Sequence, residues 1–152
     1  MTDLDSTNKE ILNNIQMNFP IDARPYKVIA NRLGLEESDL IQRIREMKDN
    51  LLIRRIGGNF SPDKLGYHST LCAAKVPENK IEEFKECVNA YTGVTHNYRR
   101  DHEEFNVWFT FIADSVEKIE NNLKDISKKT GVAEILNLPA TRVFKISANF
   151  KV

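Results

Sequence analysis

The spacing of apolar residues changes near residue 60, and this change constrains the fold more than any other feature of the sequence. In residues 1–50 the apolar residues recur every three or four positions, which is the spacing of amphipathic helices. Beyond residue 67, short apolar runs of strand length alternate with helical patterns. A chain with two such parts is expected to fold as two small domains, each with a modest core.

The first part predicts three helices followed by a wing. The first helix is expected over about residues 6–19, and Pro25 suits the first turn of a second helix. Gly34 ends that helix, and a third helix runs to about Asn50, so the second and third helices form a helix-turn-helix. Residues 51–59 are expected to form the short strand and turn of a wing.

The second part predicts the element order β-α-β-β-α-β, which is the ferredoxin-like arrangement. The expected elements are strands at 67–76, 91–100 and 105–113, helices at 77–90 and 115–130, and a last strand or pair of strands over 135–151. The sequence therefore predicts an α+β protein. A winged helix-turn-helix domain is expected in residues 1–60, and a ferredoxin-like domain in residues 61–152.

Composition limits the class of protein. The chain has 41% apolar and 29% charged residues, as in a soluble globular protein. No apolar stretch reaches the roughly 20 residues of a membrane span, and the N-terminus does not resemble a signal peptide, so a cytoplasmic protein is expected. Cys72 and Cys87 lack C-x-x-C spacing and are expected to be buried, reduced thiols rather than a disulfide.

Two features count against DNA binding by the helix-turn-helix. The 22 basic and 22 acidic residues cancel, whereas phosphate-binding proteins usually show a basic excess. The third helix also begins with Glu36, Glu37 and Asp39, and acids in the first turn of a recognition helix face the DNA backbone. Such acids are favourable at a helix N-terminus, which explains why they are tolerated. We expect no sequence-specific DNA binding.

Residues 94–109 are the most informative segment. Strand alternation puts His96, Tyr98, Arg100 and, if the strand continues, His102 on one face. An arginine can clamp a carboxylate, and a histidine can transfer a proton or ligate a metal, so this row suits an anionic ligand. A solvated hairpin explains the pattern about equally well. Two histidines six residues apart match no standard zinc spacing.

The order of the two domains resembles the Lrp/AsnC family of bacterial and archaeal regulators. Members of that family bind DNA through the first domain, dimerise through the second, and bind amino acids between their C-terminal domains. Short sequence motifs give a closer resemblance, to the siroheme decarboxylases, which are Lrp/AsnC-like proteins of heme and heme d1 biosynthesis. This resemblance is carried by His96-Asn97-Tyr98, Arg100-Asp101-His102 and Asn106-Val107-Trp108-Phe109.

The resemblance runs from about Leu4 to Asn149 and includes Arg24-Pro25-Tyr26 and the stretch Leu65-Gly66-Tyr67. His68 departs from the family pattern, where arginine is more usual, and its role is open. Position 99 varies in the family, so no role is carried over to Arg99.

The resemblance implies a carboxy-lyase that removes carbon dioxide from two acetate side chains of siroheme, giving didecarboxysiroheme, with no cofactor beyond the iron of the substrate. It implies catalytic roles for His96, Tyr98 and His102, and substrate-binding roles for Arg100, Asn106 and Trp108. His96 or His102 is a possible axial ligand of the siroheme iron. Of these two, His96 is the expected proton donor, and His102 the expected ligand of iron or of a carboxylate.

The resemblance also implies a partner, because family members commonly pair two related subunits through their ferredoxin-like sheets. The partner is expected to be a paralogous decarboxylase subunit or a second copy of this chain. Which of the two subunits this chain is, and whether it carries catalysis, stays open. The alternatives are a DNA-binding Lrp/AsnC-type regulator and a heme-sensing regulator that binds a tetrapyrrole without converting it.

Overall fold

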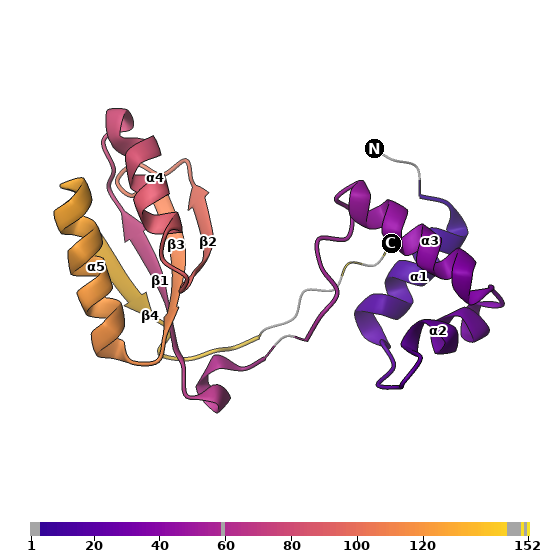
Figure 1. Cartoon of the computed structure of the whole chain (residues 1–152). Coiled ribbons are helices and arrows are strands. Elements are labelled where there is room, and N and C mark those ends of the chain that lie inside the picture. The colour runs from indigo at the N-terminus through magenta and orange to yellow at the C-terminus, as the bar shows by residue number, and fades with distance from the viewer. Residues whose placement is uncertain (1–3, 59, 146–149, 151) are drawn as a thin grey trace. The chain divides into compact units, whose positions relative to one another are not determined.

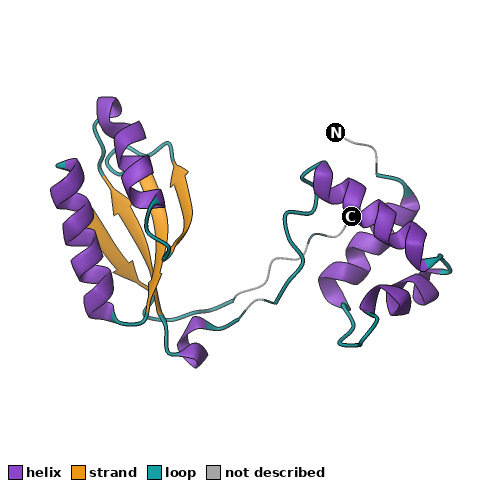
Figure 2. Cartoon of the chain, viewed as in Figure 1, coloured by secondary structure: helices purple, strands orange, loops and turns teal. Residues whose placement is uncertain are grey.

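The described residues form two compact units, each with its own hydrophobic core (Figure 1). The computed structural model describes residues 4–58, 60–145, 150 and 152. Figure 2 shows that the first unit is helical and that the second combines helices with strands. The predicted α+β class, with a helix-turn-helix part before a ferredoxin-like part, is confirmed.

The first unit contains helices α1 (Ser6–Met17), α2 (Pro25–Leu33) and α3 (Glu37–Asp49). Asp5 caps α1, because its carboxylate accepts the backbone N–H of Asn8 at 2.6 Å. Gly34 ends α2 in the left-handed region at φ 65°, which glycine adopts without strain. The apolar faces of the three helices meet in one core, whose fully buried members include Ile11, Ile29 and Leu40.

The wing prediction is wrong for residues 51–58, which form no strand. The backbone N–H of Leu51 bonds to the carbonyl of Lys48, and those of Leu52 and Ile53 bond to the carbonyl of Met47. These residues therefore satisfy the free carbonyls at the C-terminal end of α3 instead of pairing as a strand. Asn59, the last residue of the predicted wing, lies outside the described residues.

Phe150, which the sequence assigns to the second domain, bonds to the first unit. The side chain of Gln16 in α1 accepts the backbone N–H of Phe150 at 2.9 Å and donates to the Phe150 carbonyl at 3.1 Å. This amide satisfies the Phe150 backbone in the way a neighbouring strand would. The predicted second C-terminal strand falls on residues 146–149 and 151, which lie outside the described residues.

The second unit contains one four-stranded antiparallel sheet with the strand order β2-β3-β1-β4, as a ferredoxin-like domain requires. The strands are β1 (His68–Ala74), β2 (Val94–Arg99), β3 (Val107–Ala113) and β4 (Ile135–Pro139). Helices α4 (Ile81–Asn89) and α5 (Val116–Thr130) pack on the same face of the sheet (Figure 1). Short 3-10 turns occupy Pro62–Leu65 and Glu78–Lys80.

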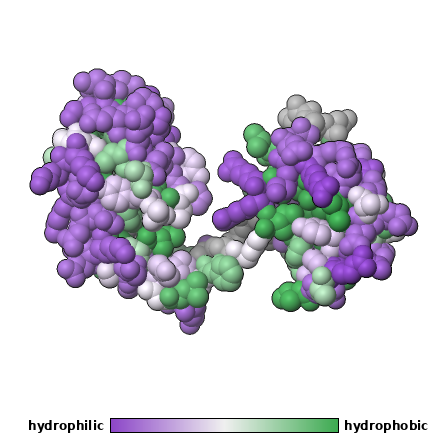
Figure 3. Space-filling model, in the orientation of Figure 1, coloured by the Kyte–Doolittle hydropathy of each residue, from purple (hydrophilic) through white to green (hydrophobic). Residues whose placement is uncertain are grey.

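The two faces of the sheet differ in burial. On β3 the odd-numbered residues, such as Phe109 and Phe111, are buried under the helices, and the even-numbered residues are only half-buried. The face without helices, called the open face here, also carries Leu71, Leu136 and Leu138, which are 41%, 39% and 41% exposed. Elsewhere hydrophilic residues cover most of each unit in the view of Figure 3. In the part of the chain that the structure describes, no helix is long and apolar enough to span a membrane.

Both cysteines are free thiols, as predicted, and they differ in burial. Cys72 is fully buried in β1, and this burial raises the pKa of its thiol to about 12. Cys87 in α4 is half-buried, and burial also raises the pKa of its thiol. Since thiolate is the reactive form, a raised pKa keeps a thiol unreactive until the pH approaches that value.

We predict that iodoacetamide at pH 8 modifies Cys87 before Cys72 in the native protein. Cys72 is both inaccessible and protonated at this pH. Mass spectrometry of tryptic peptides over time measures both rates, and the same reaction in urea is the control, where both thiols should react alike. Equal rates in the native protein would contradict the burial of Cys72.

Candidate functional site

An extra residue in β2 decides which side chains reach the open face. Val94 pairs with Phe111, whereas His96 pairs with Thr110, so the register shifts by one residue at Thr95. Such a bulge reverses the alternation of side chains along a strand. Val94 therefore packs into the helix-covered core, while His96 lies on the open face.

The alternation predicted for the rest of β2 is confirmed. Tyr98 pairs with Trp108 on the open face. Asn97 points toward the helices and donates to the side chain of Asn89 in α4 at 2.9 Å. Arg99, on the same side, forms an ion pair with Glu78 at 3.0 Å.

Five predicted site residues form a continuous row on the open face, here called the hairpin row. His96 stacks on Tyr98, with ring centroids 6.0 Å apart and an interplanar angle of 28°. The guanidinium carbon of Arg100 lies 5.9 Å from the ring centroid of Tyr98 and 5.9 Å from that of Trp108. The His102 ring lies 5.9 Å from the Trp108 ring. Two aromatic rings thus hold Arg100, with a histidine at each end of the row.

His102 reaches the row by a different route from the one predicted. β2 ends at Arg99, so strand alternation does not place His102. Instead its Nδ1 accepts the backbone N–H groups of Glu104 and Phe105, each at 3.1 Å. The Phe105 carbonyl in turn accepts the indole N–H of Trp108 at 2.7 Å. These bonds fold the loop back so that His102 meets Trp108.

Asn106, predicted to bind substrate, has its side chain outside the hairpin row. Its Oδ1 accepts the N–H of Val76 at 2.9 Å and its Nδ2 donates to the Val76 carbonyl at 2.8 Å. Its own carbonyl accepts the backbone N–H of Arg100 at 2.9 Å. Asn106 therefore ties the start of β3 to the end of β1 and holds the backbone of Arg100. These bonds give it a positioning role, and its predicted role in substrate binding stays a prediction.

The charge of Arg100 is available to a ligand. None of the carboxylates that the structure describes lies within ion-pair distance of its guanidinium, whereas the neighbouring Arg99 is paired with Glu78. The side chains of His96 and His102 are exposed, and Tyr98 is 48% exposed. The hairpin row is thus an accessible, cationic and aromatic surface that suits a flat anionic molecule.

A cavity of about 360 Å³ lies beside the His102 loop. Its wall includes Lys75 and Glu134, which form an ion pair at 3.6 Å. Two predicted site residues, His102 and Asn106, also line it. His102 therefore contacts both this cavity and the hairpin row.

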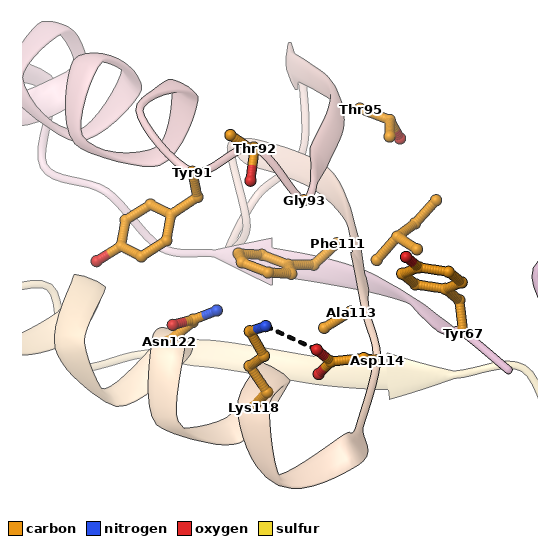
Figure 4. Close-up of a pocket in the computed structure, with 11 residues that line it drawn as sticks. Tyr67, Tyr91, Thr92, Gly93, Thr95, Phe111, Ala113, Asp114, Lys118 and Asn122 are labelled. Atoms are coloured by element: carbon orange, nitrogen blue, oxygen red, sulfur yellow. Dashed lines mark hydrogen bonds and ion pairs between the residues drawn. The ribbon is translucent and has the colours of Figure 1, made fainter.

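A second cavity, of about 410 Å³, was not predicted from the sequence (Figure 4). It lies at the opposite end of the β2–β3 pair, and Lys118 donates to Asp114 in its wall at 2.8 Å. This hydrogen bond lowers the pKa of Asp114 and raises that of Lys118, so the two charges neutralise each other. Gly93 lies in the wall of this cavity and is the residue in the sequence that could have indicated it. A Cβ at this position would lie 2.2 Å from the Ile112 carbonyl oxygen, so a larger residue would not fit.

Comparison with known proteins decides the family. Residues 64–145 match the AsnC-like ligand binding domain, and residues 8–54 match the siroheme decarboxylase NirDL-like HTH domain. The siroheme decarboxylase alpha subunit of Oleidesulfovibrio alaskensis is 51% identical over 98% of this chain and 90% of its own length. That of Desulfovibrio desulfuricans is 48% identical over 99% of this chain and 86% of its own length. The chain belongs to the siroheme decarboxylase family.

A solved structure of this family is also similar. The crystal structure of the siroheme decarboxylase NirDL in co-complex with an iron-uroporphyrin III analogue matches 95% of this chain and 47% of its own chain. The TM-score is 0.68 and the sequence identity is 31%. The present chain therefore spans about half of that NirDL chain.

For this siroheme decarboxylase family member we predict that Asn106→Ala lowers the free energy of unfolding of the second unit by about 1–3 kcal/mol, since the substitution leaves buried backbone groups of Val76 unpaired. Urea unfolding followed by the fluorescence of Trp108, the single tryptophan, measures the change. The matched control is Asn97→Ala, which removes an exposed hydrogen bond and should change stability by less than about 0.5 kcal/mol. Equal effects of the two substitutions would contradict the positioning role.

Proposed function

We propose that this chain is a subunit of a siroheme decarboxylase, a carboxy-lyase of heme biosynthesis that converts siroheme to didecarboxysiroheme. The observation that carries the proposal is the hairpin row of a family member, with Arg100 held between Tyr98 and Trp108 and a histidine at each end. Siroheme is a flat macrocycle with several carboxylates. The aromatic rings suit the macrocycle, and the guanidinium suits a carboxylate.

The reaction makes simple demands on the protein. The bond between the methylene carbon and the carboxylate breaks, carbon dioxide leaves, and the electron pair is delocalised into the macrocycle. A proton then adds to the methylene carbon, which becomes a methyl group. The protein must therefore hold the carboxylate, exclude water and deliver that proton. Arg100 is the proposed clamp, and no cofactor beyond the iron of the substrate is part of the proposal.

We propose that a paralogous subunit, or a second copy of this chain, covers the open face. Leu71, Leu136 and Leu138 leave apolar surface there beside the hairpin row, and burying it favours association. The relatives are named alpha subunits, which supports a heterodimer. The free thiols Cys72 and Cys87 support a reducing compartment, the cytoplasm.

Anaerobic incubation with siroheme tests the function. The chain is mixed with siroheme, both alone and together with its partner subunit. The mass of the extracted pigment is then measured by mass spectrometry. The expected product is lighter than siroheme by two molecules of carbon dioxide. Bound siroheme of unchanged mass in the presence of the partner would support a tetrapyrrole-sensing regulator instead, and no binding at all would contradict the proposal.

Arg100→Ala should weaken siroheme binding about tenfold to a hundredfold, because a charge-assisted hydrogen bond contributes about 1.5–3 kcal/mol. Arg100→Lys should restore only part of the affinity, since an ammonium does not reproduce the planar fork. The matched control is Arg99→Ala, because Arg99 lies on the other face and pairs with Glu78. If titrations monitored by absorbance show Arg100→Ala within twofold of Arg99→Ala, Arg100 is not the clamp.

We also propose that the helix-turn-helix does not read DNA. Glu37 and Asp39 occupy the first turn of α3. Two basic side chains nearby are engaged within the unit, because Arg24 pairs with Glu37, and Arg43 pairs with Asp5 at 3.0 Å and Asp39 at 3.2 Å. These two cations are therefore partly neutralised before any DNA could meet them.

A gel-shift assay with DNA upstream of the gene for this chain, at physiological salt, should show no sequence-specific binding. The reason is the repulsion between the α3 carboxylates and the phosphates of the major groove. Nanomolar binding that depends on sequence would favour the Lrp/AsnC-type regulator.

A further inference from the structure

The two histidines of the hairpin row differ in the hydrogen bonds that their ring nitrogens make. The Nδ1 of His102 faces two donors, the backbone N–H groups of Glu104 and Phe105, at 3.1 Å each. The Nδ1 of His96 lies 3.0 Å from the hydroxyl oxygen of Thr95, which can donate or accept. The contacts therefore restrict which nitrogen carries the proton in His102, whereas His96 can carry its proton on either nitrogen.

The loop holds His102 in one tautomer. A neutral imidazole has one N–H and one lone pair, and backbone N–H groups can only donate. The lone pair of His102 is therefore at Nδ1, and its proton is at Nε2. A ring in this state has no free lone pair for a metal.

His96, unlike His102, can carry its proton on Nδ1. Its Nδ1–H can donate to the Thr95 hydroxyl, and this leaves the lone pair of Nε2 free. Metal-bound histidines usually donate their other ring N–H to a nearby acceptor in this way, which fixes the orientation of the ring. Thr95 is the extra residue of the β2 bulge, so the bulge supplies both the position of His96 on the open face and the acceptor for its ring.

We infer that His96 is the axial ligand of the siroheme iron and that His102 donates a hydrogen bond from Nε2 to a siroheme carboxylate. This inference rests on the proposed function. It replaces the assignment expected from the sequence, in which His96 delivers the proton and His102 is the ligand of iron or of a carboxylate. Thr95 is a positioning residue for His96.

The tautomer of His102 is measured without siroheme. A two-bond ¹H–¹⁵N correlation spectrum of the imidazole nitrogens, recorded on the ligand-free chain at pH 8, should show Nε2 of His102 protonated and Nδ1 unprotonated. His102→Asn identifies the signals of this ring, because they disappear from the spectrum. A proton on Nδ1 of His102 would overturn the inference and leave the proposed function standing.

The second measurement is the absorption spectrum of bound siroheme in two variants, assembled with the partner subunit. In His102→Asn the amide oxygen can still accept the loop N–H groups, but the Nε2–H donor is gone. This variant should bind siroheme about tenfold to a hundredfold more weakly, with an unchanged spectrum. In His96→Gly the spectrum should shift, and added imidazole should restore it.

The controls separate the possible failures. His68→Asn changes an exposed histidine of β1 outside the hairpin row and should leave both spectrum and affinity unchanged. Backbone amide signals of Glu104 and Phe105 show whether the loop of His102→Asn is intact. A shifted spectrum in His102→Asn with an intact loop, or an unshifted one in His96→Gly, would overturn the inference. Failure of the wild-type complex to bind siroheme would instead refute the proposed function.

Discussion

The bulge at Thr95 is the constraint on which the candidate site depends. Without the extra residue, the parity that puts Val94 in the core would turn His96 and Tyr98 toward the helices. Burying an imidazole and a phenol among Phe109 and Phe111 would be costly unless each found a hydrogen-bond partner. With the bulge, Val94 packs into the core, while His96 and Tyr98 lie on the open face.

The rest of the site follows from contacts that continue this geometry beyond the end of β2. Asn106 binds both backbone groups of Val76 and accepts the Arg100 N–H, so the backbone under the guanidinium is fixed at the edge of the sheet. The His102 ring satisfies two loop N–H groups that would otherwise face solvent. Several of the groups that orient the site are therefore bonded within the protein, which leaves Arg100, Tyr98 and the histidine Nε2 atoms for a ligand.

Local patterns in the sequence predicted the elements well but not the contacts between distant residues. Pro25, Gly34 and the two apolar periodicities placed the helices and strands, and the alternation in β2 placed Tyr98. The predicted wing strand is absent because residues 51–53 bond to the end of α3. The bond between Gln16 and Phe150 joins positions 134 residues apart, which local patterns do not reveal. Likewise, the bonds of Asn106 to Val76 could not be predicted from local patterns, because the two residues lie 30 positions apart.

The central claim is that siroheme binds at the hairpin row, and the position of its iron tests this most directly. Ferric siroheme is paramagnetic and broadens the NMR signals of nearby nuclei, most strongly at short distance. In ¹H–¹⁵N spectra of the labelled chain within its complex, we expect the strongest broadening at residues 96–110, including the indole N–H of Trp108. The strongest broadening at the cavity of Tyr91, Asp114 and Lys118, or in helices α1 to α3, would contradict the account.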